Sequence, residues 1–148
     1  MFGKKKKSKI LVAEDSDVQR GVLTAIVESR KNYEVIEANN GTDAMKLVYK
    51  TNPDVVILDV EMPGMNGLQI CYRMKNDPKI GHIPVMIVTA TSQNSKKSDE
   101  QLRERARADD FITKPFQSAD ILKRIDRLLA DAPDPLHEEH GTRIRWRI

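Results

Sequence analysis

The chain has 148 residues, of which 39% are hydrophobic and 32% charged, a composition typical of one soluble domain with a sizeable core. No apolar run approaches the roughly 20 residues that span a bilayer, and no apolar segment follows the N-terminal lysines, so neither membrane insertion nor a secretory signal is expected. The single cysteine, Cys71, excludes an internal disulfide and favours a reducing, cytoplasmic setting.

The net charge of +3 is unevenly distributed along the chain. Eight basic residues lie near the two ends: Lys4, Lys5, Lys6, Lys7, Lys9, Arg143, Arg145 and Arg147. Subtracting these eight from the 25 basic residues leaves 17, against 22 acidic ones, so the central domain is acidic. Nucleic-acid binding through that domain is therefore not expected, and residues 1–8 are interpreted as a basic, disordered lead-in.

Five apolar segments with strand character alternate with segments of helical periodicity. The expected strands are Lys9–Ala13, Tyr33–Ala38, Val55–Asp59, Pro84–Thr89 and Asp110–Thr113. Between them, and after the last, apolar residues recur at i, i+3 and i+4, the spacing that lines one face of a helix. Strands that alternate with helices favour right-handed crossovers and a parallel sheet covered on both faces.

The fourth expected helix, about Ser95–Ala108, has few apolar residues, chiefly Leu102 and Ala106. It is expected to pack lightly and to shift at low energetic cost. A merely exposed helix is equally compatible with this composition.

The organisation that follows is a domain over residues 9–130 and a linker or tail over 131–148. Arg143, Arg145 and Arg147 alternate with apolar residues, which is the period of a half-buried strand. Three interpretations stay open: the first strand of an appended effector domain, a strand that docks on a sheet edge, or a basic tail that touches anionic surfaces.

Chemically capable groups follow four of the five strands, at the edge where parallel strands end and ligand sites form. They are Glu14 and Asp15 after the first strand, Asp59 on the third, Thr89 on the fourth and Lys114 after the fifth. Carboxylates suit Mg²⁺, and one of them can attack phosphorus while an ammonium and a hydroxyl hold the remaining oxygens. The pattern predicts magnesium-assisted phosphoryl transfer.

In this order the motifs resemble the receiver domain of two-component response regulators, over about residues 8–130. The motifs are Glu14-Asp15, Asp59 with Met62-Pro63-Gly64 and Gly67, Thr89-Ala90, and Lys114-Pro115-Phe116. The resemblance implies a doubly wound, flavodoxin-like α/β fold: a five-stranded parallel sheet in the order 2-1-3-4-5 with five helices.

The resemblance also implies a role for each site residue. Asp59 would be the phosphoacceptor, and Thr89 and Lys114 would contact the phosphoryl group. The magnesium ligands would be Glu14, Asp15, Asp59 and the backbone carbonyl of Glu61. Thr89 and Phe111 would form the switch, and the Lys114–Pro115 bond would be cis.

The function implied is that of a signalling domain that catalyses only its own phosphorylation and dephosphorylation. A sensor histidine kinase or a phosphotransfer protein would supply the phosphoryl group. The surface of helix 4, strand 5 and helix 5 would then signal to a downstream effector protein or domain, with a phosphorylation-dependent homodimer as one possible outcome.

The sequence departs from the family pattern at two places. Arg107-Ala108 replaces a small pair that is usually Gly-Ala, and Phe111 stands where a tyrosine is frequent.

Two other functions stay open. A haloacid-dehalogenase-like phosphatase would need a second Asp where Glu61 stands. A receiver-like module that binds partners without phosphorylation would not need Asp59, Thr89 and Lys114 all to be present.

Overall fold

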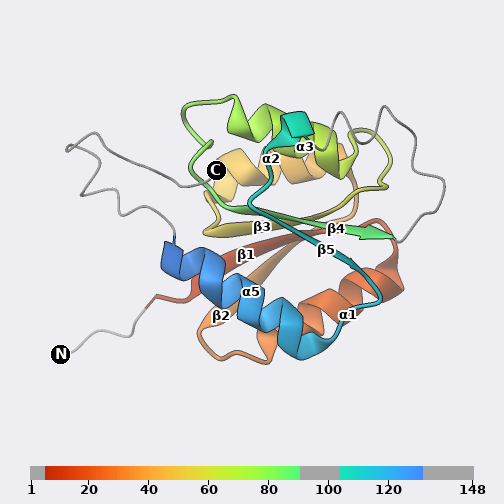
Figure 1. Ribbon diagram of the computed structural model, residues 1–148, viewed down its shortest axis with the longest axis vertical. Coiled ribbons are helices and arrows are strands. Elements are labelled where there is room, and N and C mark those ends of the chain that lie inside the picture. The colour runs from red at the N-terminus through yellow and green to blue at the C-terminus, as the bar shows by residue number, and fades with distance from the viewer. Residues whose placement is uncertain (1–5, 91–103, 132–148) are drawn as a thin grey trace.

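The computed structural model describes residues 6–90 and 104–131, which form a central sheet between two layers of helices (Figure 1). The elements in chain order are β1 (Ser8–Ala13), α1 (Asp17–Glu28), β2 (Tyr33–Ala38), α2 (Gly41–Thr51), β3 (Val55–Asp59), α3 (Gly67–Lys75), β4 (Val85–Ala90), β5 (Asp110–Lys114) and α5 (Ser118–Asp131). The strands are parallel and ordered β2-β1-β3-β4-β5, which confirms the predicted fold.

The fourth expected helix falls mostly on residues that the structure does not describe. Residues 104–106 are helical, and the rest of the expected span up to residue 103 lies outside the described part of the chain. Residues 1–5 of the expected lead-in (1–8) and residues 132–148 of the expected tail (131–148) also lie outside it. Ser8, expected in the lead-in, begins β1, and Asp131, expected in the tail, ends α5.

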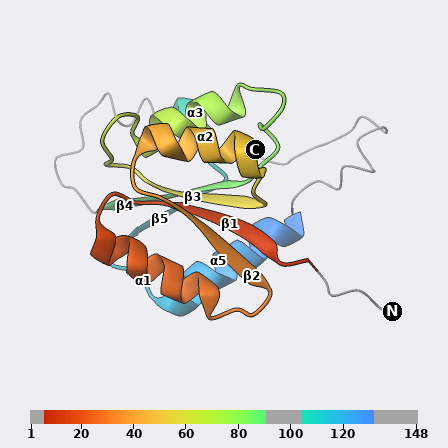
Figure 2. The same ribbon diagram turned by 180° about the vertical axis from the view of Figure 1, so that it is seen from behind.

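The continuous apolar runs of the strands are explained by burial on both faces of the sheet. All five residues of β3 are buried, and its neighbour β1 is buried from Ile10 onwards. Alternate residues point to opposite faces, so Val56 and Leu58 join the core beneath α2 and α3, while Val55 and Ile57 join the core beside α1 and α5. Figure 2 shows the same two layers from behind.

Among the helices that begin at the edge of the sheet that carries the polar motifs, α1, α2 and α3 each begin with a side-chain cap. Ser16 accepts from the backbone N–H of Gln19 at the start of α1, and Asn40 accepts from that of Asp43 at the start of α2. Asn66 forms a reciprocal capping box at the start of α3. Such caps each stabilise a helix by about 1 kcal/mol, so the loops at this edge are held in defined positions.

The turn before β5 contains a residue in a strained backbone conformation. Arg107 has a φ of 55°, in the left-handed region that costs a non-glycine residue about 1–2 kcal/mol. This is the position where the receiver pattern usually has the glycine of its Gly-Ala pair. The guanidinium of Arg107 lies 3.3 Å from the carbonyl oxygen of Lys75 and 3.4 Å from Asn76 Oδ1, both long for hydrogen bonds.

We expect Arg107→Gly to raise the free energy of unfolding by about 0.5–1 kcal/mol, because glycine adopts a positive φ without strain. Urea unfolding measures the change. The matched control is Arg105→Gly, at an exposed helical position, which should lower stability by about 1 kcal/mol. A loss of stability in Arg107→Gly would show that the two long contacts outweigh the strain.

Candidate functional site

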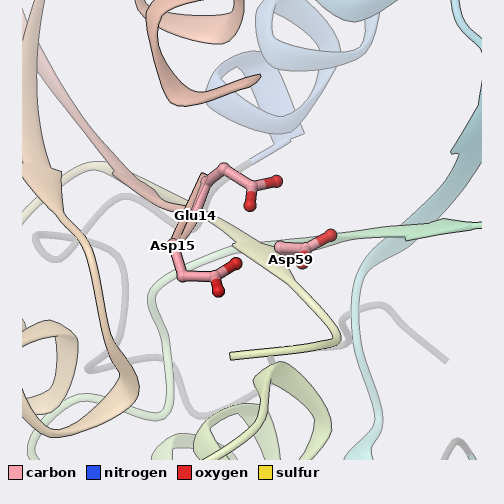
Figure 3. Close-up of side chains that lie close together, drawn as sticks. All are labelled: Glu14, Asp15 and Asp59. Atoms are coloured by element: carbon pink, nitrogen blue, oxygen red, sulfur yellow. The ribbon is translucent and has the colours of Figure 1, made fainter. Parts of the chain in front are cut away.

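Three carboxylates meet at the carboxyl edge of the sheet (Figure 3). Glu14 and Asp15 follow β1, Asp59 ends β3, and each of them offers an oxygen within 4.8 Å of the other two. Glu14 is 1% exposed and Asp59 is 6% exposed, whereas Asp15 is exposed. The fold therefore brings together the three acids expected from the sequence, because β1 and β3 are neighbouring parallel strands.

Lys114, at the end of β5, brings a positive charge to these acids. Its Nζ lies 3.1 Å from Asp59 Oδ1 and 3.2 Å from Glu14 Oε1. Burial lowers the pKa of Lys114, but the hydrogen bond and charge of Asp59, together with Glu14, outweigh that effect and raise it. The lysine therefore stays charged near neutral pH and joins the end of β5 to the ends of β1 and β3.

One ammonium beside three carboxylates leaves excess negative charge in a partly buried site. Burial, followed by the charge of Glu14, raises the pKa of Asp59, and Lys114 offsets this only in part. A cation would relieve the repulsion, and the all-oxygen donor set is the one that Mg²⁺ takes. The chemistry of these residues therefore fits a magnesium ion.

Space for further ligands lies beside Asp15. A hollow of about 480 Å³ is lined by Asp15, Val60, Glu61, Met62, Pro63 and Asn66. Glu61, whose backbone carbonyl was expected as a metal ligand, lies in this lining. The hollow thus adjoins the carboxylate cluster on the side of the loop that follows β3.

The raised pKa of Asp59 has a consequence for stability. A carboxyl group whose pKa is higher in the folded than in the unfolded chain favours folding below its unfolded pKa, and this contribution is lost as the pH rises through its folded pKa. At pH 7 the ionised Asp59 is therefore a net cost to the fold.

We expect Asp59→Asn to melt at a higher temperature than the wild type at pH 7 in the presence of a chelator. The gain should shrink as the pH falls through the raised folded pKa of Asp59 towards the ordinary pKa of aspartate, because the folded-state carboxyl group then becomes neutral. Thermal melts of the two proteins at pH 4 and pH 7 measure this difference. A gain of equal size at both pH values would contradict the electrostatic cause.

Thr89 and Phe111 occupy the two remaining positions expected from the sequence. Thr89 lies near the end of β4 beside Thr113 of β5, and its hydroxyl donates to the carbonyl of Ala90 at 3.2 Å. Phe111 is half-buried and packs against the core beneath α2 and α3. The Lys114–Pro115 bond is cis, as the resemblance implied.

Three further residues support the site and were missed by the sequence analysis. The backbone N–H of Ser16 donates to Glu14 Oε2 at 3.0 Å, and Arg20 donates to the carbonyl oxygen of Glu14 at 2.9 Å. Gln19 Oε1 accepts a hydrogen bond from Lys114 Nζ. All three lie at the polar start of the helix that follows the acid pair. This position in the sequence was the signal that could have identified them as neighbours of the site.

The strand order and the polar groups at the strand ends are those of a doubly wound, flavodoxin-like α/β domain. The family model for the response regulator receiver domain matches residues 10–126, so the chain belongs to this family. Within the described residues, no helix is long and apolar enough to cross a membrane.

The chain resembles both small and large members of the family. It is 37% identical to protein PilH of Pseudomonas aeruginosa, covering 83% of this chain and 98% of that protein. It is 34% identical to response regulator PleD of Caulobacter vibrioides and 35% identical to histidine kinase P4 of Formosa agariphila, but covers only 26% and 9% of these longer proteins.

Solved structures show the same fold. The receiver domain of a signal transduction histidine kinase from Syntrophus aciditrophicus is 35% identical, with a TM-score of 0.76 over 83% of this chain and 90% of that one. A putative response regulator from Chloroflexus aurantiacus is 30% identical, with a TM-score of 0.74 over 84% of this chain and 99% of that one.

Proposed function

We propose that this receiver domain accepts a phosphoryl group on Asp59, in a reaction that depends on Mg²⁺, and passes the signal to an effector. The observation that carries the proposal is the setting of the Asp59 carboxylate. It is held at the end of a buried strand, with Lys114 Nζ 3.1 Å away and with Glu14 and Asp15 beside it. A sensor histidine kinase or a phosphotransfer protein would be the donor in the cytoplasm.

Each residue of the site has a task in this reaction. One oxygen of Asp59 attacks phosphorus, and the bond from phosphorus to the donor's leaving group breaks, with the electron pair leaving on that group. Lys114 and the hydroxyl of Thr89 hold the oxygens of the transferred group. Glu14, Asp15, Asp59 and the backbone carbonyl of Glu61 would hold Mg²⁺, which when bound offsets the negative charge of the carboxylates and the phosphoryl oxygens.

The signalling output would be a change in the surface of the domain that contacts an effector. Binding of Lys114 and Thr89 to the new phosphoryl oxygens pulls on the ends of β5 and β4, and Phe111 lies on β5. We propose that this alters the surface of helix 4, β5 and α5, which contacts an effector or a second copy of the chain. The domain would catalyse only its own phosphorylation and dephosphorylation.

The test is the intact mass of the full chain after treatment with acetyl phosphate and Mg²⁺. One added phosphate per chain is expected, and none in Asp59→Ala. An adduct that persists in Asp59→Ala would refute the assignment of Asp59. Turnover of many equivalents of a phosphomonoester would indicate a phosphatase instead, and a wild type that takes no phosphate would favour a phosphorylation-independent module.

Lys114 is expected to matter more for the conformational response than for metal binding. Its ammonium reaches the acids from the end of β5, whereas the proposed oxygen ligands for Mg²⁺ belong to other parts of the chain. Lys114→Ala should keep the Kd for Mg²⁺ within a few-fold and should weaken the change in backbone amide chemical shifts of β5 and α5 on phosphorylation. Wild-type-like shifts in the phosphorylated variant would contradict this role.

A further inference from the structure

The ammonium of Lys114 has a third acceptor beside the two carboxylates. The side-chain carbonyl oxygen of Gln19 accepts a hydrogen bond from Nζ, which reaches α1 from the end of β5. Building on the proposed function, we infer that Gln19 is a positioning residue that keeps the Lys114 ammonium beside Asp59 before and after phosphorylation. It acts through Lys114, since that ammonium is its contact in the site.

The start of α1 holds Gln19 in place. Gln19 is the third residue of the helix, and its backbone N–H donates to the capping oxygen of Ser16 at 3.2 Å. The backbone N–H of Ser16 donates in turn to Glu14 Oε2 at 3.0 Å. Only the carbonyl end of an amide can accept from an ammonium, so the contact also fixes which way the Gln19 amide points.

Among the described residues, three side-chain oxygens surround the Lys114 ammonium, which has three N–H donors. Asp59 Oδ1 lies 3.1 Å from Nζ and Glu14 Oε1 lies 3.2 Å from it, and Gln19 Oε1 accepts a hydrogen bond from the same atom. They belong to different elements: the end of β3, the residue after β1 and the first turn of α1. The Lys114 side chain is 26% exposed, and its hydrogen bond with Gln19 lies on the exposed side of the site.

Phosphorylation would change two of these acceptors and leave the third unchanged. Asp59 becomes an acyl phosphate, and the N–H that faced its carboxylate then faces the phosphoryl oxygens. Glu14 would be one of the residues that hold Mg²⁺ and would share its charge with the bound ion. Gln19 is neutral and belongs to neither group, so it remains the same acceptor in both states. A lysine side chain has many rotamers, and an acceptor that is held in place in both states restricts them.

The experiment compares three variants of the full chain with the wild type. Gln19→Met keeps the length of the side chain but removes the acceptor, and Gln19→Glu restores an acceptor. Val18→Met is the matched control, because Val18 is the adjacent residue of the same helical turn and is 78% exposed. The measurements are the rate of phosphorylation by acetyl phosphate at saturating Mg²⁺, the Kd for Mg²⁺, and the NMR resonance of the Lys114 ammonium in ¹⁵N-lysine-labelled protein, assigned with Lys114→Arg.

Gln19→Met is expected to react about fivefold more slowly, with a Kd for Mg²⁺ within about twofold of the wild type. Its Lys114 ammonium resonance should shift and broaden, and Gln19→Glu should recover both the resonance and most of the rate. Val18→Met should match the wild type throughout.

The results separate this inference from the proposed function. A wild type that takes no phosphate on Asp59 would refute the function, whatever the ammonium resonance shows. If the wild type reacts and Gln19→Met has the same rate and the same Lys114 resonance, the positioning role is overturned. Equal slowing in Gln19→Met and Val18→Met, or slowing that Gln19→Glu does not reverse, would assign the effect to the helix instead and would also overturn it.

Discussion

Replacing Asp15 by asparagine is expected to remove most of the thermal stabilisation that we expect Mg²⁺ to give the wild-type protein. A ligand present at a hundred times its Kd stabilises the folded state by about 2.7 kcal/mol, which for a domain of this size raises the melting temperature by about 10 °C. Asp15 is the exposed member of the carboxylate cluster and borders the hollow beside it, so its oxygen is the accessible one for an entering ion. Loss of this charged ligand should weaken Mg²⁺ binding by about 100-fold.

The phosphorylation rate at a fixed, subsaturating Mg²⁺ concentration should fall by a similar factor in Asp15→Asn. Asp17→Asn is the matched control, because it removes the same charge two residues further along the chain. The Asp17 side chain is 87% exposed and is paired with Arg20. Thermal melts with and without Mg²⁺ provide the measurement. A wild-type shift in Asp15→Asn, or loss of the shift in Asp17→Asn, would exclude a specific metal site at the carboxylate cluster.

The parallel sheet and the meeting of the acids at one of its edges were predictable from the sequence for a simple physical reason, whereas the order of the strands came from the resemblance to receiver domains. A strand buried on both faces must be almost wholly apolar, so a carboxylate at the end of such a run, as at Asp59, marks the edge of the sheet. Parallel strands place their ends at one edge. The acids after β1, the aspartate of β3 and the lysine of β5 therefore had to lie near one another once the sheet was correct.

The contact from Gln19 to Lys114 was not predictable in this way. It depends on the rotamers of two long side chains that are 95 residues apart in sequence, and no periodicity records these rotamers. The backbone of Arg107 is an intermediate case. The resemblance placed a small residue there, and the structure shows why: the position has a positive φ. The expected fourth helix carried too few apolar residues for its position to be argued from its pattern, and most of it lies outside the described residues.

A second large effect is expected at Gly67, the first residue of α3, which lies against the strand that carries Asp59. A Cβ added to Gly67 would lie 2.2 Å from the carbonyl oxygen of Asp59 and 2.9 Å from its carbonyl carbon. Both are backbone atoms of β3, so neither can move aside as a flexible side chain would. The backbone N–H of Gly67 also donates to the carbonyl of Val60 at 3.0 Å, which fixes the start of the helix at this close approach.

Gly67→Ala must therefore push α3 away from the end of β3, with consequences for both the fold and the site. We expect a loss of about 3 kcal/mol in the free energy of unfolding, the size of a severe overpacking defect. Displacement of the Asp59 backbone by about 1 Å should slow phosphorylation by about 100-fold in the folded fraction. Urea unfolding and the rate of acetyl phosphate labelling, measured well below the unfolding midpoint, report the two effects separately.

Gly21→Ala is the matched control, with the same atom added to the exposed, helical Gly21 of α1, where nothing lies within 4 Å of the new Cβ. It should instead raise stability by about 0.5–1 kcal/mol, because alanine favours a helix over glycine, and it should leave the labelling rate unchanged. The opposite signs follow from one difference, the presence or absence of the β3 backbone beside the new methyl group. Unaltered stability and labelling in Gly67→Ala would mean that α3 can withdraw without moving Asp59, and that the helix does not hold the aspartate in place.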